Sequence, residues 1–123
     1  MNAMRSDQLM AILNELDASS ADIQASAVIS ADGLMMASHL PQGLDQDRVG
    51  AMGAALLSLG TRVAKELERG TPEQVLVKGE LGYVLMVQAG PDAVLTVLAS
   101  SAAKLGLVFL DAKRASAALA QVL

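Results

Sequence analysis

The sequence contains no cysteine and no tryptophan, and its only aromatic side chains are Tyr83 and Phe109. Without cysteine the chain forms no disulfide and offers no thiol nucleophile, which fits a reducing cytoplasm. Two aromatic rings cannot build a base-stacking platform or an aromatic ligand cage. The net charge is −4 and no run of Lys and Arg occurs, so an electrostatic nucleic-acid footprint is also excluded.

Long hydrophobic runs are absent as well. The longest near-candidate, 49–59, is about half of the roughly 20 residues that span a bilayer. Residues 1–7 lack the positive charge and apolar run of a signal peptide. The sequence therefore predicts a cytoplasmic protein that does not insert into a membrane.

What the sequence has in excess is aliphatic side chains. Hydrophobic residues make up 53% of the 123 residues and charged residues 18%, which is an apolar balance for a small soluble protein. This length fits one domain, 1–123, and no second one. Part of the apolar excess is therefore expected to cover a subunit interface.

The first half of the chain reads as a helix, a hairpin and a long helix. Ser6 is a candidate N-cap for a helix that ends at 19–22, and a strand is expected at 23–30. Asp32-Gly33 predicts a hairpin turn into a strand at 34–38. Asp45 is the expected N-cap of a helix over 46–69, with Gly70 as its C′ residue.

Three short strands and a last helix follow. The strands are expected at 74–78, 83–88 and 94–99, separated by turns, and short runs of this kind favour an antiparallel meander. Ser100 or Ser101 is the candidate cap of a helix that ends near 122. The predicted fold class is α/β (α+β), in the order αββαβββα, with helices on the faces of an antiparallel sheet.

Residues with catalytic chemistry are scattered. His39 is the only histidine and has no neighbouring ligand, so a solvated strand end is expected rather than a metal site or a Ser-His-Asp triad. Glu80 and Asp92 suit turns better than a paired acid and base. Gly79-x-x-Gly82 is a hairpin turn, and no nucleotide-binding P-loop occurs. The sequence predicts no catalytic residue, no metal and no cofactor, and therefore no enzyme.

The helix over 46–69 is apolar around most of its circumference. A stripe expected to face the sheet comprises Val49, Met52, Leu56, Val63 and Leu67. The rest of its surface is too apolar for solvent, which predicts burial on both sides and hence a homodimer. The predicted dimer-interface residues are Ala51, Ala54, Ala55, Leu57, Ser58 and Thr61.

Charged residues gather at the end of this helix. Basic side chains there suit the negative end of the helix dipole. The alternative is a rim that contacts a partner, and an arginine finger from Arg62 or Arg69 is a further, less favoured alternative. The candidate rim comprises Arg62, Lys65, Glu66 and Arg69.

Several segments together resemble the roadblock family, of the dynein light chain and bacterial MglB-like types. They are Ala27-Val28-Ile29-Ser30-Ala31-Asp32-Gly33-Leu34, the small-residue helix from Val49, Gly90-Pro91-Asp92-Ala93-Val94-Leu95 and Ala102-Ala103-Lys104-Leu105-Gly106-Leu107-Val108. The resemblance spans about 8–123. Lys104 departs from it, because many relatives carry Asn there.

The resemblance implies a five-stranded antiparallel sheet, with the central helix on one face and the terminal helices on the other. It implies a homodimer built through the central helix and an edge strand, which binds a small Ras-like GTPase and modulates its hydrolysis or localisation. The alternatives from other classes are a PAS- or GAF-like small-molecule sensor and a generic interaction scaffold. The GTPase, the pathway, and the choice between activator and docking platform are left open.

Overall fold

Eight elements form the predicted order of helices and strands in the computed structural model, which describes the backbone from residue 2 to 123 and side chains from residue 4. Their bounds are α1 Asn2–Ser19, β1 Ile23–Ser30, β2 Met35–His39, α2 Gln46–Glu66, β3 Val75–Gly79, β4 Gly82–Gln88, β5 Ala93–Ser100 and α3 Leu105–Val122. The sequence-based order αββαβββα is confirmed.

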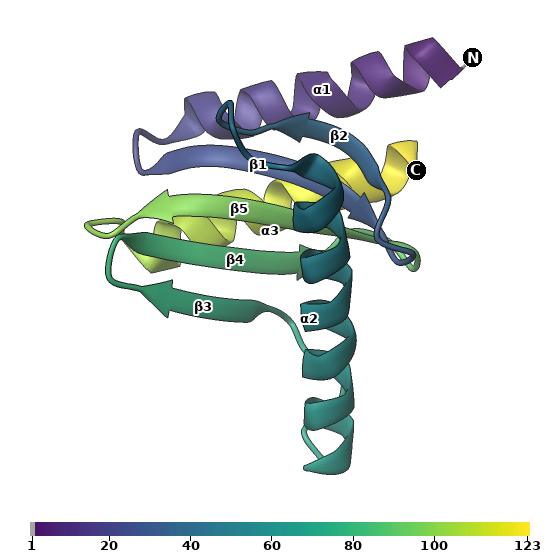
Figure 1. Cartoon of the computed structure of the whole chain (residues 1–123), viewed down its shortest axis with the longest axis vertical. Helices are drawn as coiled ribbons and strands as arrows, with labels where there is room; N and C mark the ends of the chain where they lie inside the picture. The colour runs from purple at the N-terminus through teal and green to yellow at the C-terminus, as the bar shows by residue number, and fades with distance from the viewer. Residues whose placement is uncertain (1) are drawn as a thin grey trace.

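The five strands form one antiparallel sheet in the order β2-β1-β5-β4-β3. The two edge strands are thus β2 and β3. Helices α1 and α3 cover one face of the sheet and α2 crosses the other (Figure 1). The C-terminal end of α2 extends past the edge strand β3, so only part of this helix rests on the sheet (Figure 1).

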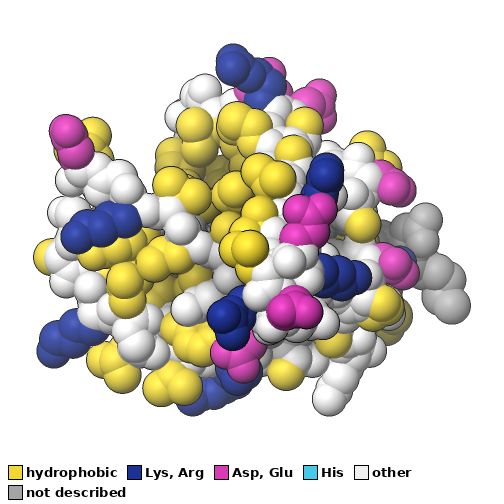
Figure 2. Space-filling model, turned by 90° about the horizontal axis from the view of Figure 1, so that it is seen from below, with side chains coloured by type: hydrophobic (Ala, Val, Ile, Leu, Met, Phe, Trp, Pro, Cys, Tyr) yellow, Lys and Arg dark blue, Asp and Glu magenta, His cyan; other side chains and the backbone are white. Residues whose placement is uncertain are grey.

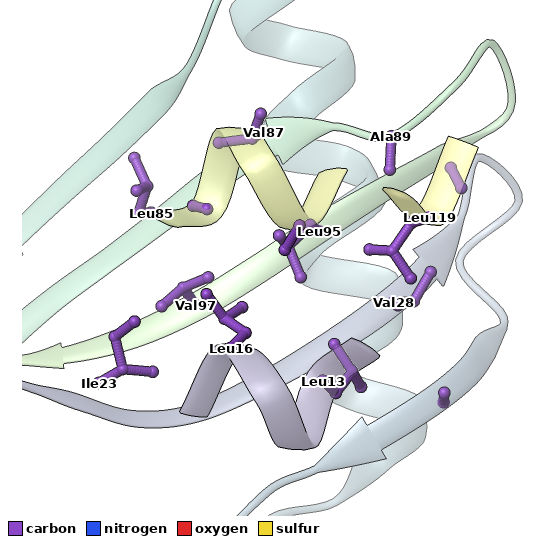
Figure 3. Packing of buried hydrophobic residues seen from close by; sticks show 14 of the residues in the cluster. Leu13, Leu16, Ile23, Val28, Leu85, Val87, Ala89, Leu95, Val97 and Leu119 are labelled. Atoms are coloured by element: carbon purple, nitrogen blue, oxygen red, sulfur yellow. The ribbon is translucent and has the colours of Figure 1, made fainter. Parts of the chain in front are cut away.

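The larger hydrophobic core lies between the sheet and the α1/α3 layer. Leu13 and Leu16 from α1 and Leu119 from α3 point toward the strand residues Val28 and Leu95 (Figure 3). A smaller cluster lies under α2 and comprises Ala27, Ile29, Met86 and Val94. Because helices cover both faces, the central strands β1 and β5 are buried almost throughout.

Two predicted helix starts are wrong. Ser6 lies inside α1, which begins at Asn2, because Met4 and Arg5 are good helix formers that extend the helix by a turn. Ser100 is the last residue of β5, where it pairs with Gly82, so sheet pairing takes the residue that the sequence suggested as a cap. Helix α3 instead begins after Lys104, whose side chain makes no capping hydrogen bond.

The predicted end of α2 is also corrected. The helix ends at Glu66, and Glu68 rather than Gly70 is the C′ residue, with a φ of 60°. The amide of Glu68 donates to the carbonyl of Lys65 at 3.1 Å, and that of Arg69 to Ala64 at 2.7 Å. This pair of hydrogen bonds is a Schellman motif, which satisfies two carbonyls that the helix end leaves free.

Candidate functional site

Helix α2 is held at its start by an N-cap, as predicted. The Asp45 carboxylate accepts hydrogen bonds from the amides of Asp47 and Arg48 at 3.0 and 3.3 Å. These bonds satisfy two of the free amides of the first turn. The helix is therefore fixed at the end that lies over the sheet.

Three glycines lie on the face of α2 that meets the sheet. A Cβ at Gly50 would collide with the carbonyl oxygen of Gly33 in the β1–β2 turn, and one at Gly53 would lie 2.9 Å from Ile29 Cδ1. A Cβ at Gly60 would lie 2.8 Å from Val75 Cγ2 of β3. Glycine thus lets the helix backbone approach the sheet closely at three levels.

This arrangement overturns the predicted sheet-facing stripe. Val49 and Leu56 are half-buried and pack on the smaller core, as expected. Met52, Val63 and Leu67, in contrast, are 60%, 47% and 64% exposed. These three large side chains were expected to point toward the sheet. They point away from it, because Gly50, Gly53 and Gly60 lie on the side of the helix that meets the sheet.

The outward side of α2 carries an apolar stripe, which we call the α2 seam: Met52, Ala55, Leu59 and Val63. These positions lie three, four and seven residues apart and so share one side of the helix. Leu59 is 58% exposed, and Ala55 is exposed as well. Exposed apolar stripes of this kind are typical of surfaces that contact another molecule.

A groove of about 450 Å³ lies between the second half of α2 and β3. It is lined mainly by Leu56, Leu59, Val63, Leu67, Pro72 and Val75. Hydrophobic side chains gather around this hollow, and charged side chains flank them (Figure 2). Strand β3 lies at the edge of the sheet, and its Val77, which shares a sheet face with the groove residue Val75, is 43% exposed. The groove and the free strand edge thus form one continuous apolar surface.

The six residues predicted to line a dimer interface differ in their exposure in the single chain. Ala51, Ala55 and Ser58 are exposed, whereas Ala54, Leu57 and Thr61 are half-buried. The Thr61 hydroxyl donates to the carbonyl of Leu57 at 2.8 Å, within the helix. Only Ala55 belongs to the α2 seam. The role of the six residues remains a prediction.

The charged rim is exposed, as an interaction surface requires. Arg62 Nε lies 3.2 Å from Glu66 Oε1, one helical turn away, and both side chains are more than half exposed. Lys65 is also exposed, and Arg69 lines the end of the groove. These charges therefore border the apolar surface.

His39 belongs to a small polar cluster on the other side of the molecule. The Asp17 carboxylate of α1 accepts a hydrogen bond from Ser26 at 2.8 Å, and its second oxygen lies 2.5 Å from His39 Nδ1. Asp17 lies between Ser26 and His39 and contacts both. In a catalytic triad the histidine lies between the serine and the aspartate, so this cluster lacks the Ser–His contact that a triad requires. Glu80 and Asp92 lie in exposed turns. Among the described residues, no three His, Cys, Asp or Glu side chains converge as metal ligands.

Sequence reasoning missed Met52, Leu59 and Val63 as surface residues. The signal that could have found them is the spacing of Gly50, Gly53 and Gly60, which lie on one side of the helix. Glycines on one side and large apolar residues on the other predict close packing inward and an exposed stripe outward. In the part of the chain that the structure describes, no helix is long and apolar enough to span a bilayer.

Comparisons with known proteins identify a family that covers most of the chain. The model of the Roadblock/LC7 domain matches residues 11–99. Two uncharacterized proteins of Methanocaldococcus jannaschii, MJ0310 and MJ1340, are each 39% identical over 89% of this chain and 92% of their own length. Among solved structures, the gliding protein MglB of Thermus thermophilus is similar, with a TM-score of 0.86 and 24% identity over 96% of this chain and 90% of that one.

An MglB with a tetrameric arrangement is similar as well, with a TM-score of 0.87 and 23% identity over 96% of this chain and 89% of that one. A Roadblock/LC7 domain from Streptomyces avermitilis has a TM-score of 0.78 and 24% identity, covering 86% of this chain and 89% of that one. At these identities the structures support the shared fold. The matches together support a small regulatory domain.

Proposed function

Because this chain belongs to the Roadblock/LC7 family, we propose that it is a non-catalytic homodimeric module that binds a small Ras-like GTPase and modulates its hydrolysis or its localisation. The observation that carries the proposal is the apolar surface of the α2 seam, the groove and the β3 edge. The family resemblance adds the class of partner. A sensor of the PAS or GAF type is not favoured, because the matched family is a different one.

The apolar surface supports the homodimer. It joins an exposed apolar helix stripe to a strand that has one free edge, and contiguous exposed apolar surface of this kind is typical of interaction sites. In a two-fold dimer the same surface meets itself, so the seam of one copy can fill the groove of the other. The tetrameric arrangement of a similar MglB supports self-association of this fold.

The charged rim supports a partner that meets both copies. Arg62, Lys65 and Arg69 border the seam, so a two-fold dimer would place two such sets on one surface. Rim charges of this kind steer association more than they anchor it. The chain's own sequence has no P-loop, so GTP would be bound by the partner. A generic interaction scaffold is the second candidate, since the same surface would serve it.

The test is a calorimetric titration of the purified chain with a Ras-like GTPase from the same genome. The GTPase is loaded in turn with GDP and with a non-hydrolysable GTP analogue. We expect binding that differs between the two nucleotide states, and no GTP turnover by the chain alone. Absence of binding in both states, with the dimer verified in the same sample, would leave only the generic scaffold.

A further inference from the structure

The α1/α3 layer carries a second surface, which lies on the sheet face opposite α2 and therefore stays uncovered in the proposed dimer (Figure 1). Leu107 and Leu110 of α3 are each 56% exposed. Lys113 and Arg114 follow them on the same side of the helix, which turns its buried side to the core through Val108, Ala112, Ala115 and Leu119. The outer side of α3 is therefore both apolar and basic.

A groove of about 120 Å³ runs beside this stripe, between α1 and α3. Its apolar lining comes from Ile12, Leu16, Ala115 and Ala118. Glu15 borders it on α1, and Asp111 and Arg114 border it on α3. The small side chains of Ala115 and Ala118 leave room for an inserted side chain, and the two exposed leucines extend the apolar surface past the groove.

The basic side chains here are not neutralised. Arg114 Nη1 lies 3.8 Å from Asp111 Oδ1, and the arginine side chain is 80% exposed, so this pair is weak. Lys113 Nζ lies 5.5 Å from the centre of the Phe109 ring rather than beside a carboxylate. No Asp or Glu occurs from 112 to 123. The outer side of α3 thus carries two basic side chains, while Glu15 and Asp111 lie at the groove beside it.

We propose that the α1–α3 surface binds an amphipathic helix of a partner protein, with an apolar residue in the groove and acidic residues on the flank that meets Lys113 and Arg114. A helix is the element that fits, because a groove between two packed helices accepts the side-chain ridge of a third. An added strand would need a free sheet edge, and the edges β2 and β3 lie elsewhere.

A second copy of this chain suits the surface less well. In a two-fold contact centred on the groove, the groove of one copy would face the groove of the other and leave unfilled space. The contact would also bring Arg114 of one copy near Arg114 of the other, which places like charges together. An anionic membrane is also less suitable, because Glu15 and Asp111 stand at the groove and would face the same negative charge. The α1–α3 surface is independent of the proposed GTPase site, which lies on the other face.

The probe is a synthetic helical peptide with Leu at positions i, i+3, i+4 and i+7, Glu on one flank and Gln on the other. A twin carries Lys in place of Glu. Each is titrated into the isotope-labelled dimer, and amide shifts are followed by NMR. We expect the Glu peptide to shift amides of α1 and α3, and to bind at least about tenfold more tightly than the Lys twin.

Two variants locate the contact. The double change Leu107→Gln and Leu110→Gln should weaken the Glu peptide about tenfold or more, because two apolar side chains lose their burial. Arg114→Glu should weaken the Glu peptide and strengthen the Lys twin, which loss of structure could not do. The control is Leu81→Gln, because Leu81 is 90% exposed in the β3–β4 turn, and it should leave the affinity unchanged.

Three results would overturn the proposal. The first is the absence of α1 and α3 shifts at millimolar peptide, or equal binding of the two peptides. The second is association of wild-type dimers in sedimentation that the double leucine variant abolishes, which would assign the surface to a second copy. The third is binding to phosphatidylserine vesicles that the same variant abolishes without any peptide binding, which would assign it to a membrane.

Discussion

At Gly50 the backbone of α2 meets the backbone of the β1–β2 turn. Gly33 in that turn has a φ of 88°, a conformation that favours glycine, and its carbonyl oxygen occupies the place where a Gly50 side chain would begin. Helix α2 can therefore lie on the sheet at this level only if position 50 lacks a side chain. The position of the α2 seam depends on this contact.

We expect Gly50→Ala to lower the free energy of unfolding by about 1–3 kcal/mol, because the added methyl group meets backbone that cannot move aside. Urea unfolding at fixed protein concentration measures the change. The matched control is Gly106→Ala in α3, where an added Cβ has nothing within 4 Å. There the higher helix propensity of alanine should leave stability equal or slightly raised. A Gly50→Ala protein as stable as wild type would contradict the close contact.

Single polar residues show what sequence reasoning cannot reach. His39 was expected at a solvated strand end, and its side chain is 56% exposed. Its contact with Asp17, and the Asp17–Ser26 hydrogen bond, join α1, β1 and β2. Only the tertiary fold brings these three positions together, since each lies on a different element. No local pattern around any of them predicts the contact.

At the scale of elements, turn residues and hydrophobic periods were sufficient for the order of helices and strands. The predicted ends of helices and strands were wrong where two local preferences compete for the same residue. Ser100 could cap a helix or end a strand, and pairing with Gly82 decides for the strand. Gly70 is a better C′ residue than Glu68 by intrinsic preference, yet the C′ position falls two residues earlier, at Glu68. Periodicity alone also could not tell which side of α2 faces the sheet.

The α2 seam gives a prediction at this scale. Leu59→Glu should weaken the homodimer by at least about 100-fold, because an unpaired carboxylate would be buried in the contact. The monomer should still fold, since Leu59 is 58% exposed in the single chain. Sedimentation velocity over a micromolar concentration series measures the change. The control is Leu81→Glu, which introduces the same charge at a side chain that is 90% exposed and lies outside the seam.

A stable wild-type monomer at micromolar concentration would contradict the dimer itself. A Leu59→Glu protein that dimerises like wild type would contradict only the assignment of the seam. In that case the six residues predicted from the sequence would be tested next, beginning with Ala51 and Ser58, which are exposed. The two outcomes therefore separate the existence of the dimer from its geometry.

At the scale of the whole molecule, α2 carries two surfaces that interact in different ways, one apolar and one charged. The seam and groove are apolar, and their burial in the proposed dimer would supply affinity without strong dependence on salt. The rim is charged and exposed, so it acts over distance and is screened by salt. If a GTPase binds a surface formed by both copies, loss of the seam and loss of the rim should have different kinetic effects.

We expect the double change Arg62→Glu and Lys65→Glu to slow association with the GTPase several-fold and to reduce its dependence on ionic strength, while the dissociation rate changes little. The protein should remain folded, because the Arg62–Glu66 pair is exposed and contributes little stability. Leu59→Glu should instead abolish binding, since the composite surface no longer forms. Stopped-flow association at several salt concentrations measures both effects. The control is Arg5→Glu on α1, an exposed charge on the opposite sheet face. Tight GTPase binding by the monomeric Leu59→Glu protein would show that one copy is sufficient. A rim variant altered only in its dissociation rate would show that these charges lie inside the contact with the GTPase rather than around it.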